Sequence, residues 1–259
     1  MVENYLYRAF LFLDSGSPNT YLCGPIIRLM KFGVVIFPGS NCDQDMIYVL
    51  SEIMGMEVEE LWHKEDDLKG CDFIVVPGGF SYGDYLRSGA IARFSPIMNS
   101  VIEHAKNGGY VMGICNGFQV LCEAGLLPGA LLHNKSRKFI CNNIHLKPQS
   151  SSCSISASLD FGKAYKIPIA HGEGNYFADE ATLEQLNEND QVIFRYCDAE
   201  GKITDEANPN GSAENIAGIC NEKGNIFGMM PHPERAADYE LANLDGKEIF
   251  DAILRGIPT

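Results

Sequence analysis

The sequence predicts an α/β protein with a doubly wound, mostly parallel sheet, helices on both faces and antiparallel additions in its second half. Two observations support this fold class. From residue 30 onward, short apolar runs without a polar face alternate with segments of helical periodicity, as in a parallel sheet covered by helices. The chain also has 259 residues, which is long enough for one large α/β core.

The first half alternates strands and helices in the order of a βαβ succession. We expect strands at residues 32–37, 58–62, 73–76 and 110–114, and helices at 43–54, 90–106 and 118–124. In the first helix the apolar residues Met46, Val49 and Leu50 lie at helical spacing. Gly55 follows and suits a helix C-terminus.

The second half is richer in strand signals. Strands are expected at residues 140–146, 154–157, 167–170, 192–196, 216–220 and 226–230, and helices at 180–187 and 246–254. These strands should include antiparallel ones that extend one end of the same sheet. Residues 30–259 contain no linker that would separate two domains, so we expect one domain there.

Residues 1–29 differ from the rest and are expected to be an N-terminal extension or the result of a mis-set start codon, because Met30 directly precedes the first convincing strand. A signal peptide is not favoured. Glu3 occupies a position where a basic residue is usual, and the apolar stretch 9–13 is too short for the hydrophobic region of a signal.

Composition excludes several classes of partner. The net charge of −14 would repel nucleic acid and anionic lipid, and no apolar run approaches the roughly 20 residues that cross a bilayer. Nine cysteines without a C-x-x-C pair indicate reduced thiols in the cytoplasm rather than disulfides or a zinc site. We expect no metal. Four histidines lack the spacing of metal ligands and are interpreted as structural or solvated: His63, His104, His133 and His145.

The sharpest local signal is a G-x-C-x-G sequence centred on Cys115, between an expected buried strand and a helix. This order is typical of a nucleophile elbow, in which flanking glycines permit a tight turn and the sulfur lies over a helix N-terminus that favours a thiolate. A buried structural cysteine explains the same pattern equally well.

A nucleophilic thiol needs a base, and His232-Pro233-Glu234 could supply one. Proline restricts the residue before it to extended conformations, and in extended chain residues two apart project to the same side. Glu234 would then orient the His232 ring. Alone, this tripeptide is a weak signal, and a surface turn explains it better.

The third segment is Gly78-Gly79-Phe80, which directly follows an expected strand. Adjacent glycines let a backbone N–H approach a reacting carbonyl closely, as an oxyanion hole requires. If this segment stood by itself, a glycine-rich turn that binds no ligand would be the preferred interpretation.

A cysteine early in the chain, an H-x-E sequence much later, and Gln119 four residues after the cysteine resemble the class I, or triad, glutamine amidotransferases. That resemblance implies a flavodoxin-like sheet. It also implies Cys115 as nucleophile, His232 as base and Glu234 as its orienting acid.

The same resemblance implies further roles for residues around the cysteine. Backbone N–H groups of Gly79 and Asn116, with that of Phe80 as an additional candidate donor, would bind the oxyanion. Gln119 would shape the glutamine pocket.

Five segments together resemble one branch of that family, the glutaminase subunits of phosphoribosylformylglycinamidine synthase. These segments are residues 38–43, 78–84, 115–119, 171–176 and 231–235. The resemblance implies hydrolysis of glutamine to supply ammonia, and partners that are a synthetase subunit and a small accessory subunit. The chain lacks nucleotide-binding glycine motifs, so no cofactor is expected here, and ATP and magnesium are expected on the synthetase.

Three alternatives fit parts of the pattern. The chain could be the glutaminase subunit of another class I amidotransferase, which residues 171–176 disfavour. It could be a protease or lactone hydrolase on a related fold, which would turn over peptides or esters and ignore glutamine. It could also be a silent binding module, in which case Cys115 would not be labelled by a reactive glutamine analogue.

Overall fold

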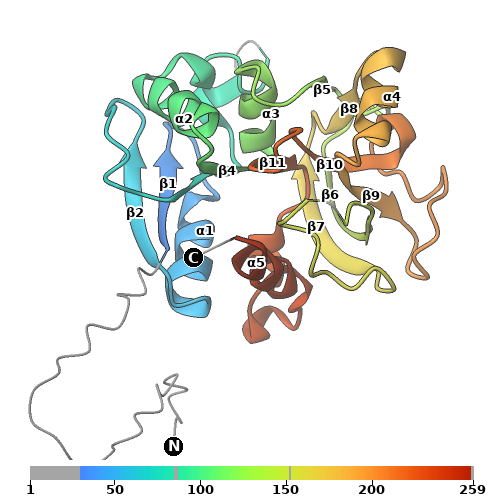
Figure 1. Cartoon of the computed structure of the whole chain (residues 1–259). Helices are drawn as coiled ribbons and strands as arrows, with labels where there is room; N and C mark the ends of the chain where they lie inside the picture. Colours follow the sequence, from blue (N-terminus) through green and yellow to red (C-terminus); the bar gives the residue numbers. More distant parts are fainter. Residues whose placement is uncertain (1–29, 85–86, 152, 258–259) are drawn as a thin grey trace, which may run out of the picture.

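A nine-stranded mixed sheet forms the centre of the protein (Figure 1). The computed structural model describes residues 30–84, 87–151 and 153–257, so the expected extension at residues 1–29 lies outside the described part. Along the sheet the strand order is β2-β1-β3-β4-β11-β10-β9-β6-β7. A separate two-stranded sheet pairs β5 with β8.

Five neighbouring strands are parallel and four are antiparallel additions. The parallel strands are β1 (Lys31–Ile36), β2 (Glu57–Trp62), β3 (Phe73–Val76), β4 (Tyr110–Ile114) and β11 (Ile226–Met229). The additions are β10 (Ile216–Cys220), β9 (Val192–Cys197), β6 (Ile140–Pro148) and β7 (Tyr165–His171), and the small sheet holds β5 (Ala130–Leu132) and β8 (Asn175–Phe177). The predicted fold class is confirmed.

Helices cover both faces of the sheet, with α2 and α3 on one side and α1 and α5 on the other (Figure 1). The α-helices are α1 (Asp43–Tyr48), which continues as a π-helix (Val49–Ile53), α2 (Pro96–Lys106), α3 (Asn116–Glu123), α4 (Glu180–Glu188) and α5 (Asp245–Gly256). Short 3-10 helices lie at Ser81–Asp84, Ala92–Phe94, Ala213–Asn215, Pro233–Ala236 and Tyr239–Leu241.

The central parallel strands explain why their sequences lack a polar face. All four residues of β3 are buried, and so are four of the five in β4, because helices enclose both sides of these strands. At the edge, β7 instead alternates buried residues with more accessible ones, as expected for a strand with one solvated face. The apolar core therefore lies beneath the strand tips that carry the predicted site.

The single helix predicted over residues 90–106 is wrong, because the chain breaks in the middle of this segment. A 3-10 helix ends at Phe94, Ser95 is extended with φ −63° and ψ 143°, and α2 begins at Pro96. Proline disfavours helical geometry in the residue before it but suits the first position of a helix. Ser95-Pro96 therefore ends one helix and starts the next.

The strand predicted at residues 154–157 is also wrong, because this segment forms turns. Hydroxyl groups bond the backbone locally: Ser156 Oγ donates to the Ser150 carbonyl at 2.8 Å, and Ser150 Oγ accepts the Cys153 N–H at 3.1 Å. Such bonds offer the backbone an alternative to a sheet ladder. The serine-rich composition thus favours turns over a strand here.

Candidate active site

Cys115 lies at a sharp turn between β4 and α3. Its backbone has φ 50° and ψ −107°, a conformation rarely adopted by a residue with a side chain and typical of functional sites. Its N–H donates to the Met229 carbonyl at 2.8 Å, which ties the turn to β11. A Cβ added at Gly117 would lie 1.8 Å from the Val76 carbonyl oxygen. The glycine of the motif therefore lets α3 start close against β3.

His232 and Glu234 form a buried pair directly after β11. Nδ1 of His232 lies 2.6 Å from Oε1 of Glu234, and both side chains are almost completely enclosed. Burial opposes charge on the ring, but the Glu234 carboxylate, then Cys115 and Cys42, outweigh it and hold the pKa of His232 well above its ordinary value. The other ring nitrogen, Nε2, makes no hydrogen bond within the described part of the chain.

Gly78 marks the point where Cys115 and His232 meet. A Cβ at this glycine would lie 2.7 Å from Cε1 of His232 and 3.4 Å from Cβ of Cys115. The two side chains therefore reach the same small volume from distant parts of the chain. The Cys115 thiol contacts the Ala170 carbonyl at 3.9 Å, so it is held at the wall formed by the end of β7.

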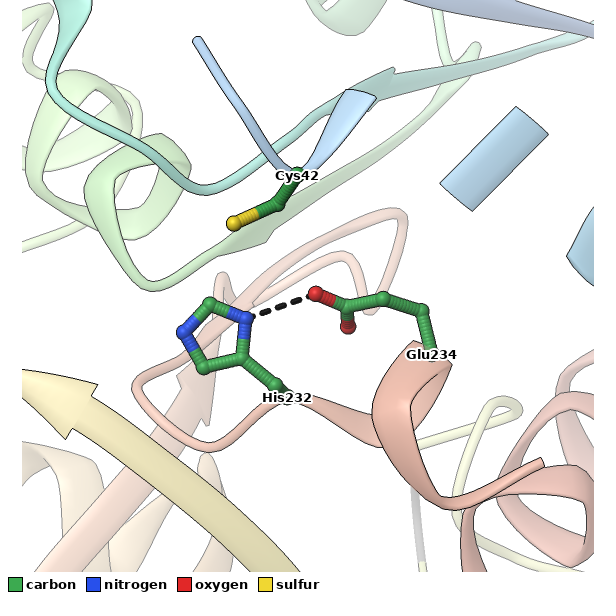
Figure 2. A group of neighbouring side chains, drawn as sticks. All are labelled: Cys42, His232 and Glu234. Carbon is green, nitrogen blue, oxygen red and sulfur yellow. Dashed lines mark hydrogen bonds and ion pairs between the residues drawn. The ribbon is translucent and has the colours of Figure 1, made fainter. Parts of the chain in front are cut away.

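Sequence reasoning assigned no role to Cys42, which lies beside the same histidine (Figure 2). One ligand atom each from Cys42, His232 and Glu234 lies within 4.8 Å of the other two. An Arg235 guanidinium N–H donates to the Cys42 sulfur at 3.2 Å, and Nε of Arg235 donates to Asp45 at 3.0 Å. Thiolate, imidazole and carboxylate are metal ligands, but here Nδ1 of His232 and Oε1 of Glu234 are hydrogen-bonded to each other.

A cavity of about 190 Å³ opens beside Cys115. Its wall includes four residues that the sequence predicted for the site, Gly79, Phe80, Cys115 and Gln119. The second half of the chain contributes residues for which no role was predicted, among them His171 and Glu173. The cavity is therefore built where the parallel strand tips meet the antiparallel additions.

The expected oxyanion donors differ in whether their N–H groups already donate a hydrogen bond within the protein. Gly79 has φ 134°, and a Cβ there would lie 2.7 Å from the Asn41 nitrogen, so the position requires glycine. The N–H groups of Gly79 and Asn116 have no acceptor among the described residues. The Phe80 N–H instead donates to the Gly39 carbonyl at 3.0 Å. Phe80 lines the cavity, but the prediction that its N–H binds the oxyanion does not fit this arrangement.

Asn116 and Gln119 act from α3 through their side chains. Nδ2 of Asn116 donates to Oε1 of Gln119 at 2.8 Å and to Asp84 at 3.3 Å. Nε2 of Gln119 donates to the Glu173 carbonyl at 2.5 Å. Burial raises the pKa of the Asp84 carboxyl, against hydrogen bonds that lower it. This network fixes the loop at Glu173 against α3, the helix that begins directly after Cys115.

One histidine interpreted as structural or solvated lies at the cavity. Nδ1 of His133 is 3.3 Å from Oε1 of Glu173, and both residues line the wall. Because the two residues come from loops far apart in the sequence, only the tertiary fold reveals that they are neighbours.

Comparisons with known proteins agree with this geometry. Residues 30–249 match the CobB/CobQ-like glutamine amidotransferase domain. Over 225 residues the chain is 56% identical to phosphoribosylformylglycinamidine synthase subunit PurQ of Gloeobacter violaceus, covering 87% of this chain and 97% of that protein. Against the subunit of the same name from Moorella thermoacetica, identity is also 56%, with coverage of 87% and 95%.

A solved structure supports the same assignment. A chain of PurLQS from Thermotoga maritima superposes with a TM-score of 0.76 at 43% identity, covering 87% of this chain and 98% of that one. This likeness covers most of the chain. The chain therefore belongs to the class I glutamine amidotransferases, in the family of the phosphoribosylformylglycinamidine synthase subunits PurQ.

Proposed function

We propose that this chain is the glutaminase subunit of phosphoribosylformylglycinamidine synthase. It hydrolyses glutamine to glutamate and ammonia, and the ammonia serves the ATP-dependent amidation of formylglycinamide ribonucleotide. The observation that carries the proposal is the buried His232–Glu234 pair, which reaches the same point as Cys115 at the edge of the cavity. Relatives at 56% identity bear the name of this synthase.

In the first half of the reaction, the Cys115 thiolate attacks the carboxamide carbon of glutamine. The N–H groups of Gly79 and Asn116 stabilise the oxyanion of the tetrahedral intermediate. The intermediate collapses as charged His232 gives its proton to the departing nitrogen, which leaves as ammonia. The product is a glutamyl thioester on Cys115, with His232 neutral.

In the second half, neutral His232 removes a proton from water, and the resulting hydroxide attacks the thioester carbon. Collapse of this second intermediate releases glutamate and restores the Cys115 thiolate and charged His232. Glu234 orients the ring throughout, because its carboxylate accepts a hydrogen bond from the Nδ1–H of His232.

Ammonia released into bulk water would be protonated and lost, so its use requires direct delivery to a partner. We propose that a synthetase subunit receives it and binds the ATP and magnesium, with a small accessory subunit completing the complex. We also propose a cytoplasmic location, which the free thiols of the described cysteines support. Among the described residues no helix is long and apolar enough to cross a membrane.

A diazoketone analogue of glutamine tests the proposal. We expect it to label Cys115 in the full chain and abolish glutamine-dependent amidation by the assembled complex, while Cys115→Ala remains unlabelled. Adduct on another cysteine, or none at all, would overturn the role of Cys115. Labelling without any amidation of formylglycinamide ribonucleotide would instead favour another class I amidotransferase.

A further inference from the structure

His171 is a buried histidine that the mechanism does not use. It is the last residue of β7, only 3% exposed, and part of the wall of the cavity that contains Cys115. It also begins the segment 171–176, for which the sequence indicated no chemical role. The hydrogen-bond partners of its two ring nitrogens therefore need to be identified.

The hydrogen bonds around Asn134 determine which ring nitrogen carries the proton. Nδ2 of Asn134 donates to the carbonyls of Lys138 at 2.8 Å and of His171 at 2.9 Å. Carbonyls only accept, so the amide orientation is fixed and Oδ1 is the acceptor. Oδ1 receives the Gly174 N–H at 3.0 Å and lies 3.1 Å from Nδ1 of His171. Nδ1 must therefore carry the proton.

With Nδ1 protonated, Nε2 of His171 holds a lone pair. Burial, and then the charge on His232, lower the pKa of His171 to about 4, so the ring is neutral near pH 7. Nε2 of this residue, which lines the cavity, is buried and has no hydrogen-bond partner among the described residues. A buried acceptor without a donor costs free energy, which a bound ligand that donates to it would recover.

We propose that His171 is a specificity-determining residue whose Nε2 accepts a hydrogen bond from the side-chain carboxamide NH₂ of bound glutamine. This inference rests on the proposed function. Glutamine presents N–H donors at the position where glutamate, its hydrolysis product, presents only carboxylate oxygens at neutral pH. A fixed lone pair attracts the first and repels the second, so His171 favours substrate over product.

The loop around His171 is built to keep this acceptor in place. The Gly174 carbonyl accepts hydrogen bonds from Asn210 Nδ2 at 2.8 Å and Ser212 Oγ at 3.3 Å, and the Tyr176 N–H donates to Ser212 Oγ at 3.0 Å. A Cβ at Gly174 would lie 2.2 Å from Cε1 of His171, so the ring packs directly on this glycine. The imidazole therefore cannot turn without disrupting the loop.

The test compares His171→Leu, which removes the acceptor, with His171→Gln, which can restore one through its amide oxygen. Each full-length variant is assembled with the synthetase, and KM for glutamine, inhibition by glutamate and the rate of labelling by the diazoketone are measured. The diazoketone reacts with Cys115 but has no carboxamide N–H. Its labelling rate therefore reports an intact nucleophile and an intact fold, independently of the proposed hydrogen bond.

We expect His171→Leu to raise KM for glutamine about tenfold and to lower the ratio of the glutamate inhibition constant to that KM, with the labelling rate unchanged. His171→Gln should recover most of the affinity. An unchanged ratio in His171→Leu, or an equal loss of labelling and glutamine affinity in both variants, would overturn the inference. If the wild type is neither labelled nor able to hydrolyse glutamine, the proposed function itself fails.

Discussion

The Nδ1 proton of His232 points at Oε1 of Glu234 across 2.6 Å, inside a region that solvent does not reach. This bond fixes the ring so that Nε2 is the nitrogen available to the thiol and the leaving group. The second carboxylate oxygen of Glu234 has no partner among the described residues. The Glu234 carboxylate therefore interacts mainly with one neighbour, the His232 ring.

Glu234→Gln should shift the pH dependence of glutamine hydrolysis. The carboxylate is a cause of the raised pKa of His232, so its loss lowers that pKa. The proton needed by the leaving ammonia is then lost at a lower pH, and the alkaline limb of the kcat/KM profile moves to lower pH. We expect kcat/KM at pH 7.5 to fall by about 10²-fold or more.

The matched control for that change is Glu184→Gln, on the exposed face of α4. It removes the same charge far from the site and should leave both limbs of the profile in place. An alkaline limb that stays fixed in Glu234→Gln would show that the carboxylate does not maintain the charge of His232.

Cys42→Ala should produce a smaller shift of the same sign. Cys42 ranks after Glu234 and Cys115 among the groups that raise the pKa of His232. We therefore expect the alkaline limb to move less than in Glu234→Gln and kcat/KM to fall by less than about tenfold. The measurement is the pH profile of steady-state kcat/KM for Cys42→Ala. The control is the same profile for Cys141→Ala, which changes an exposed cysteine. A loss as large as that of Glu234→Gln would mean that Cys42 has a role in the chemistry.

These residues show what sequence patterns can and cannot give. The elbow at Cys115 and the pair at His232 and Glu234 are local sequence features, and each follows from a strand end, a glycine or a proline. The contact of Cys42 with Arg235 joins positions 193 residues apart, so no local sequence pattern predicts it. The same holds for His171 and for the loop around it.

The errors have equally specific origins. The predicted helix at residues 90–106 failed because apolar periodicity was given more weight than the proline that interrupts it. Phe80 was included among the oxyanion donors because the sequence cannot show that the carbonyl of Gly39, from another loop, accepts its N–H. Backbone hydrogen bonds between loops depend on tertiary placement, which residue types determine only weakly.

Gly78→Ala should impair catalysis more than folding. The added methyl group would lie 2.7 Å from Cε1 of His232 and 3.2 Å from the Cys42 sulfur, so it would push the base away from the thiol. We expect kcat to fall by about 10²-fold, while thermal unfolding and the far-UV circular dichroism change little. Normal turnover in this variant would mean that His232 can move without loss and that its placement beside Gly78 is not required.

Gly117→Ala sets two opposing effects against each other in α3. Alanine favours a helix over glycine by about 1 kcal/mol. The new Cβ, however, would lie 1.8 Å from the backbone oxygen of Val76, and neither α3 nor β3 can yield as a flexible side chain would. Overpacking of this kind costs about 1–3 kcal/mol, occasionally more, so the clash should win and the free energy of unfolding in urea should fall.

Gly162→Ala is the control variant, because the new Cβ would meet only the Asp160 side chain at 3.0 Å. This variant should change the free energy of unfolding by no more than about 0.5 kcal/mol. Gly117→Ala should also slow labelling of Cys115, since moving the start of α3 moves the N–H of Asn116 and the thiol together. If Gly117→Ala were as stable as the wild type and Cys115 were labelled as fast, α3 could not lie directly on β3. Close packing of α3 on β3 would then not explain the strained backbone at Cys115.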